Sequence, residues 1–178
     1  MARTEPFTSH DWRLFSLSLR YIDRTLDVAF RMATGPDPNP GRDDISTQVI
    51  GVRVYVTELG LLQSLLYRAA GERSDEQECA DAALGALYRE LEKRYPELRS
   101  LRNALFAHPP FVEGVIGDHE VLMFTEHGVF RAPVEGGAAH AIVEDPLLAH
   151  PWVEDLVERF RDLISRRHAD AVASEGFG

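Results

Sequence analysis

The chain has a single cysteine, Cys79, among its 178 residues. One cysteine excludes an internal disulfide and any zinc site built from several cysteines. The first residues contain no positively charged segment followed by an apolar stretch, so we expect no signal peptide. No apolar run approaches the length needed to cross a bilayer, so we expect no membrane partner. Together these absences predict a cytoplasmic protein.

Basic residues are fewer than acidic ones, which gives a formal net charge of −10. This balance argues against a general nucleic-acid coat protein, because phosphate binding depends on concentrated Lys and Arg. It leaves room for an enzyme that holds RNA in one local basic cleft. Such a local concentration of cations is formed by Arg89, Lys93, Arg94, Arg99 and Arg102.

Several common kinds of site are missing. The sequence contains no phosphate-binding glycine loop, and no serine has the context of a nucleophile elbow. His119 and His127 have no third metal ligand at a suitable spacing, so we expect them to be exposed histidines of a strand pair. We therefore predict neither a metal site nor a cofactor.

The length and the ordinary composition, 44% hydrophobic and 27% charged, predict one soluble domain over residues 1–178. Apolar residues recur at helical spacing in several stretches. We expect helices over residues 9–34, 45–70, 75–94, 96–107 and 151–171. Between residues 111 and 143 the pattern becomes extended, which predicts an antiparallel β-meander of three or four strands. The predicted fold class is mainly α, a helical bundle with a small β-meander inserted before the last helix.

Local signals refine these helices. Thr8 or Ser9 can cap the first helix, with Asp11 in its first turn. Ser74 with Gln77 resembles a capping box for the third helix.

Polar groups within the helices are harder to interpret. Glu58 and Gln63 interrupt the very apolar second helix. We expect them to be exposed or locally paired, and contact with a catalytic site is the alternative. We expect a basic cluster near the end of the last helix to complement the negative end of the helix dipole, and RNA contact is the alternative. It consists of Arg159, Arg161, Arg166, Arg167 and His168.

The segment from Leu98 to Pro110 combines groups that can bind a phosphate and move a proton. We expect a helix up to about Ala107, because two consecutive prolines follow His108 and neither can continue a helix. Arg102 and Asn103 would lie on the helix face away from the core. A cation, an amide and an imidazole thus gather near one helix end.

Arg102-Asn103, followed by four residues and His108, resembles the Arg-x(4–6)-His motif of HEPN domains. The resemblance implies a small helical bundle. It also implies a metal-independent ribonuclease of a bacterial toxin or phage-defence type, in which the motifs of two protomers meet across a two-fold axis. RNA, a second copy of the chain and an antitoxin or regulatory protein are the partners it implies.

Under this reading, His108 acts as general acid or base, Arg102 stabilises the transition state and Asn103 orients either partner. Additional contacts to substrate are predicted for Arg99, Arg94 and Lys93.

The same residues allow other roles. His108 can simply cap helix carbonyls while Arg102 binds a carboxylate. The chain would then be a non-catalytic HEPN-like module that binds a nucleotide or a partner protein, or an unrelated scaffold. Residues 3–10 and 161–168 also fit the loose pattern, without Asn after the arginine. Pro110 stands where one HEPN variant carries a modifiable tyrosine, so that mode of control is not expected here.

Overall fold

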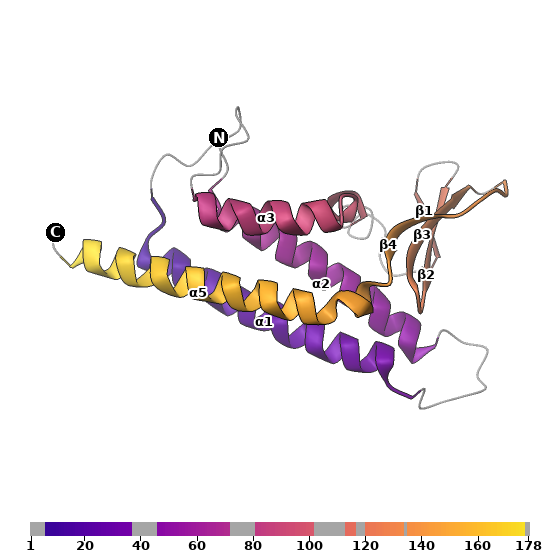
Figure 1. The fold of residues 1–178 in the computed structure, drawn as a ribbon, viewed down its shortest axis with the longest axis horizontal. Helices are drawn as coiled ribbons and strands as arrows, with labels where there is room; N and C mark the ends of the chain where they lie inside the picture. Colours follow the sequence, from indigo (N-terminus) through magenta and orange to yellow (C-terminus); the bar gives the residue numbers. More distant parts are fainter. Residues whose placement is uncertain are drawn as a thin grey trace.

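The computed structural model describes residues 6–36, 46–71, 81–101, 113–116, 120–133 and 135–176. Long helices run along the long axis of the molecule (Figure 1). They are α1 (Ser9–Thr34), α2 (Thr47–Ala69), α3 (Ala82–Arg94) and α5 (His150–Glu175). Both α1 and α3 pack against α2 and α5, so α1 and α3 occupy diagonal corners of the bundle. Residues 98–101 are helical as well. The predicted mainly α fold is confirmed.

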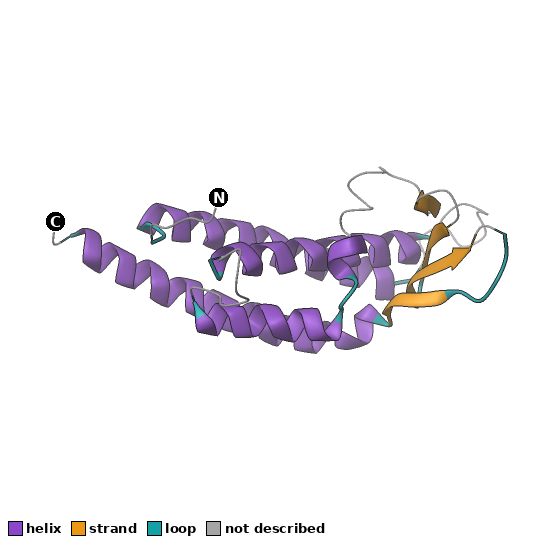
Figure 2. Ribbon diagram, turned by 90° about the horizontal axis from the view of Figure 1, so that it is seen from above, coloured by secondary structure: helices purple, strands orange, loops and turns teal. Residues whose placement is uncertain are grey.

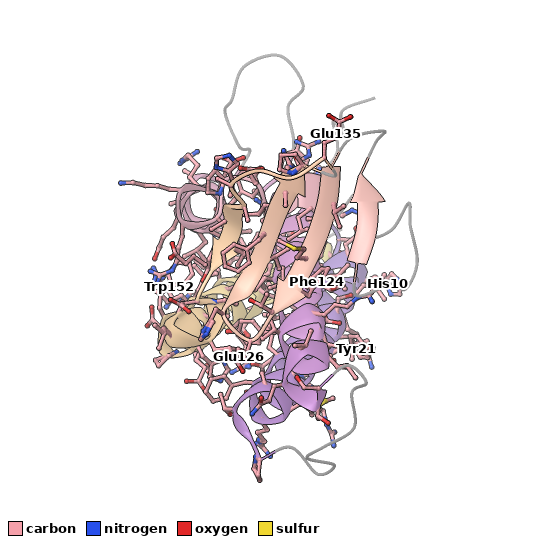
Figure 3. All side chains as sticks on the ribbon, turned by 90° about the vertical axis from the view of Figure 1, so that its right-hand side faces the viewer. His10, Tyr21, Phe124, Glu126, Glu135 and Trp152 are labelled. Atoms are coloured by element: carbon pink, nitrogen blue, oxygen red, sulfur yellow. The ribbon has the colours of Figure 1, made fainter. Side chains whose placement is uncertain are left out.

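A four-stranded antiparallel sheet stands at one end of the bundle (Figures 2 and 3). Its strands are β1 (Glu113–Ile116), β2 (Glu120–Thr125), β3 (Gly128–Pro133) and β4 (His140–Glu144), paired in chain order. Phe124 of β2 is buried, and the Arg53 guanidinium of α2 lies 5.6 Å from its ring centroid. The short helix η1 (Pro146–Ala149) then leads into α5. The meander predicted before the last helix is therefore present, and it packs on the bundle.

Helix α1 forms where its local sequence signals predict. The Thr8 side chain accepts from the Asp11 backbone N–H, and the Asp11 carboxylate accepts from the Thr8 backbone in return. This reciprocal pair satisfies amides that would otherwise be unpaired at the helix start. Apolar residues at helical spacing bury one face: Trp12, Leu19, Ile22, Leu26, Ala29 and Ala33.

Helix α3 begins later than predicted, at Ala82 instead of residue 75. Asp81 has an extended backbone, and its carboxylate accepts from the N–H groups of Ala83 (3.0 Å) and Leu84 (3.2 Å). Two charge-assisted bonds to the free amides make this residue an effective N-cap. Ser74 and Gln77, the basis of the predicted start, lie outside the described residues.

Arginines of α5 join this helix to its neighbours. Arg159 donates two hydrogen bonds, of 3.0 and 2.8 Å, to the Glu90 carboxylate of α3. Arg161 donates to Asp23 of α1 at 2.7 Å, and Arg167 forms a salt bridge to Asp81. These contacts give the three arginines a different role from the helix-dipole or RNA contact that the sequence indicates.

Helix α2 is the most apolar element. Of the helices in the described ranges, it alone is long and apolar enough to span a membrane, and 61% of its apolar window is buried in the bundle. Such burial is typical of the core helix of a soluble bundle.

The crossing of α1 and α2 depends on Gly51. A Cβ atom at this position would lie 2.5 Å from the Ala33 nitrogen and 2.9 Å from the Ala29 oxygen, both backbone atoms that cannot rotate away. We expect Gly51→Ala to lower the free energy of unfolding by about 1–3 kcal/mol, because overpacking outweighs the better helix propensity of alanine. Urea unfolding measures this change.

Gly176→Ala is the control for that substitution, because its Cβ would meet nothing nearer than the Val172 oxygen at 3.5 Å. If the Gly51→Ala protein is as stable as the Gly176→Ala protein, α1 and α2 leave enough room for a methyl group at residue 51, and the expected overpacking is wrong.

Candidate nucleic-acid interface

The three predicted catalytic residues, Arg102, Asn103 and His108, lie outside the described residues. The helical residues 98–101 lead directly to them. Leu98 and Leu101 are buried, whereas Arg99 is exposed. The described start of this segment therefore has one core face and one solvent face, as the leucine spacing predicts.

Arg99 opens onto a pocket of about 200 Å³ between α2, α3 and its own helical segment. The residues that line it are Gln63, Ser64, Tyr67, Arg68, Tyr88 and Arg99. This volume is below the roughly 300–1,000 Å³ of sites for drug-sized ligands. It suits a small group such as one base or one phosphate.

Two cations of the pocket are available to an anionic ligand. Within residues 46–71 and 81–101 and the other described ranges, neither Arg68 nor Arg99 forms an ion pair. The Arg99 guanidinium lies 5.6 Å from the Tyr67 ring centroid, at cation–π distance. An arginine held on an aromatic face keeps its outer N–H groups free for phosphate oxygens.

The tyrosines supply an aromatic wall. The rings of Tyr67 and Tyr88 have centroids 5.3 Å apart and are tilted by 45°. The Tyr88 hydroxyl donates to Glu92 at 2.8 Å, and burial together with this hydrogen bond raises the pKa of Tyr88 to about 12. Tyr88 is thus a neutral phenol at physiological pH and does not repel a phosphate. Aromatic faces next to arginines are typical of surfaces that bind single-stranded nucleic acids.

Gln63 lies in the wall of the pocket and is only 3% exposed. Its Nε2 is buried and has no hydrogen-bond partner among the described residues. The prediction that Gln63 is exposed or locally paired is therefore wrong. A buried amide that lacks a partner is unfavourable, and a bound ligand or water with an acceptor oxygen would satisfy it.

The other two predicted substrate contacts lie elsewhere. The Arg94 guanidinium lies 4.7 Å from the Trp152 ring centroid, and Lys93 is exposed on α3. Neither residue lines the pocket. Only Arg99 of the predicted substrate-binding set joins Tyr67, Arg68 and Tyr88.

Comparison with known proteins gives no assignment. No family model, no curated protein and no solved structure matches this chain. The pocket itself remains distinctive, because it combines two arginines without ion pairs in the described ranges, a tyrosine pair and an unsatisfied buried amide.

Sequence reasoning missed Tyr67, Arg68 and Tyr88. The adjacent Tyr67 and Arg68 were the available signal, since an aromatic residue beside a cation is common where nucleic acid is bound. Tyr88 is 21 positions further along the chain. Only the antiparallel packing of α2 and α3 brings its ring to Tyr67.

Proposed function

We propose that this protein is a cytoplasmic, metal-independent HEPN-like endoribonuclease of a bacterial toxin or phage-defence type. The observation that carries the proposal is the pocket beside the start of the Arg102–His108 motif. Arg99 and Arg102 are only three residues apart in the chain. RNA held by a phosphate at Arg68 and Arg99 would therefore lie close to the residues proposed to cleave it.

The proposed reaction uses the RNA's own 2′-hydroxyl as the nucleophile. A base removes the 2′ proton, the 2′ oxygen attacks phosphorus, and the P–O5′ bond breaks while an acid protonates the leaving 5′ oxygen. The products are a 2′,3′-cyclic phosphate and a 5′-hydroxyl. His108 suits either proton transfer, Arg102 stabilises the charge on the phosphorane, and Asn103 orients one of them.

A homodimer is part of the proposal, because the motif has one histidine, and a second copy of the chain would supply the other of the acid and the base. Helix α1 has an exposed apolar stripe of Leu14, Leu17, Tyr21 and Val28. Since α1 is diagonal to α3 in the bundle, pairing through this stripe would keep the α3 helices of the two copies apart. The catalytic dimer must therefore form through the side of the bundle that carries α3 and residues 98–101.

The test of the proposed function is cleavage of mixed, end-labelled RNAs by the purified protein in EDTA. We expect cleavage that leaves a 2′,3′-cyclic phosphate, and no cleavage of 2′-O-methyl RNA of the same sequence. Cleavage that requires added Mg²⁺, or that also occurs in the 2′-O-methyl RNA, would contradict the mechanism.

The pocket can be tested by binding alone, with 2′-O-methyl RNA as an uncleavable ligand. We expect Arg99→Ala to weaken binding about 5–30-fold, which corresponds to about 1–2 kcal/mol. It should also reduce the magnitude of the slope of log K against log salt by about one, as expected for the loss of one phosphate contact. Fluorescence anisotropy at several salt concentrations measures both quantities.

Arg89→Ala is the matched control for Arg99→Ala. Arg89 is exposed on α3, and it is not a lining residue of the pocket. The Arg89→Ala substitution removes the same positive charge from a nearby surface. Equal losses in the two variants would mean that overall charge, not the pocket, determines RNA affinity.

The second candidate function is a non-catalytic module that binds a nucleotide or a partner protein. The small volume of the pocket favours this reading, since it suits one base or one phosphate of a nucleotide. A folded protein that binds a mononucleotide, loses that binding in Arg99→Ala and cleaves no RNA would support it.

An antitoxin or other regulatory protein remains the expected partner of the toxin-type enzyme.

A further inference from the structure

A buried histidine at the start of α5 lies among three helices. His150 is 7% exposed, its ring is stacked on that of Phe30 from α1 with centroids 3.9 Å apart, and its Nδ1 lies 3.0 Å from the Tyr55 hydroxyl of α2. The ring therefore has a fixed plane and one fixed nitrogen. Its other nitrogen, Nε2, has no hydrogen bond to a described residue.

Two carboxylates face this nitrogen. The Nε2 atom lies 3.7 Å from a Glu154 oxygen and 3.9 Å from an Asp27 oxygen. These separations are too long for hydrogen bonds, and no described residue supplies Nε2 with one. The three atoms all lie within 4.8 Å of one another. A nitrogen on a buried ring, without a hydrogen bond to a described residue and facing two carboxylates, is an arrangement that a cation would complete.

The spacing fits a single metal ion after a small movement. An ion bound at about 2.0–2.2 Å by nitrogen and carboxylate oxygen holds neighbouring ligand atoms about 3–3.5 Å apart. The Asp27 and Glu154 side chains are 42% and 57% exposed, so both can move by the roughly 1 Å that the longest of these separations requires. Their exposure also gives the ion a path from solvent and leaves room for water ligands.

Tyr55 provides the support that a metal-binding histidine usually has. When Nε2 binds a metal, Nδ1 carries the proton and donates it to a fixed acceptor, which sets the orientation of the ring. The Tyr55 hydroxyl, fully buried and 3.0 Å from Nδ1, is placed to accept this hydrogen bond. The Phe30 ring covers the imidazole face.

We propose that Asp27, His150 and Glu154 bind one divalent first-row transition-metal ion. One imidazole and two carboxylates match the ligand preferences of ions such as Zn²⁺ and Mn²⁺, and they favour these over Mg²⁺, which prefers oxygen ligands alone. The ion joins α1 to the first turn of α5. It stabilises the bundle and takes no part in the RNA cleavage proposed above.

The experiment is calorimetric titration of the full, EDTA-treated and desalted chain with Zn²⁺, with Mg²⁺ titrated in parallel. We expect one Zn²⁺ per chain, a higher melting temperature with Zn²⁺, and much weaker binding of Mg²⁺. His150→Gln, Glu154→Gln and Asp27→Asn should each weaken Zn²⁺ binding by about 100-fold or more. Tyr55→Phe should weaken it by about 10–100-fold, as loss of a supporting group does.

His127→Gln is the matched control. His127 also lies near two carboxylates, with Nε2 3.4 Å from Glu126 and Nδ1 3.9 Å from Asp145. Because these carboxylates face different ring nitrogens, they cannot converge on one ion, and the His127 side chain is 72% exposed. We expect His127→Gln to bind Zn²⁺ as the parent does.

Asp27→Asn and Glu154→Gln change exposed side chains, so they keep the test decisive if His150→Gln fails to fold. Absorption by bound Co²⁺ gives a second measurement, because its visible spectrum should change when His150 is replaced. The proposal is overturned if the parent binds no Zn²⁺, or if Asp27→Asn and Glu154→Gln bind it as tightly as the parent. Three groups that merely share a proton would give the first of these results.

Discussion

The His108→Ala protein should cleave RNA about 10²–10⁴ times more slowly than the parent, because a positioned general acid or base contributes a factor of that size. Arg102→Ala should lose about 10²–10³, the usual effect of removing one group that stabilises transition-state charge. Neither change alters Tyr67, Arg68, Tyr88 or Arg99, so binding of 2′-O-methyl RNA should be retained. Single-turnover cleavage in EDTA gives the rates.

His168→Ala is the control for His108→Ala. Residues 161–168 also fit the loose Arg-x(4–6)-His pattern, with His168 as the histidine. The arginine of this match, Arg161, is bound to the Asp23 carboxylate. We expect the His168→Ala protein to cleave RNA at the parental rate. If the parent and the His108→Ala protein cleave equally, the activity comes from another site or from a contaminant, and the proposed role of His108 is wrong.

The Glu58→Gln protein should be more stable than the parent at pH 8 by up to about 3 kcal/mol, and nearly equal to it at pH 4.5. Glu58 is 7% exposed, and its Oε2 has no hydrogen-bond partner in the described ranges. Burial raises the pKa of this carboxyl from an ordinary 4.5 to about 7.

The direction of the pH effect follows from proton binding. Between pH 4.5 and 7 the native protein retains the Glu58 proton that the unfolded chain releases, so the parent loses stability as the pH rises through this range. Above pH 7 both states are ionised and the loss is complete. Glutamine cannot ionise, so the Glu58→Gln protein should not show this loss.

Urea unfolding of both proteins at several pH values between 4.5 and 8 measures the effect. Glu135→Gln, in the exposed turn after β3 (Figure 3), is the control for general loss of a negative charge. The same pH dependence in the parent and in Glu58→Gln would show that the Glu58 carboxyl is not desolvated in the native state.

The features that the sequence predicts well depend on neighbours within a few residues. The Thr8–Asp11 capping pair and the buried apolar face of α1 are read directly from local spacing and residue type. The same reasoning did not identify Asp81, which caps α3 at Ala82. Asp81 also binds Arg167, and this contact joins residues 86 positions apart.

Burial of polar groups is the part that sequence could not provide. Glu58 and Gln63 break an apolar pattern, which normally indicates an exposed position, yet α1 and α3 pack against α2 and both side chains are buried. Asp27 and His150 are likewise brought together only by the packing of α1 on α5. The local sequence indicates only part of this cluster, because His150 and Glu154 lie one helical turn apart on the same helix.

The contacts of α5 also determine when during synthesis the protein can fold. Glu175 accepts hydrogen bonds from the backbone and hydroxyl of Ser9, which precedes it by 166 residues, and Arg161 reaches back to Asp23. A chain still emerging from the ribosome has α1, α2 and α3 but lacks the helix that packs against α1 and α3 and binds both through its arginines. We therefore expect the bundle to close only after α5 has left the exit tunnel.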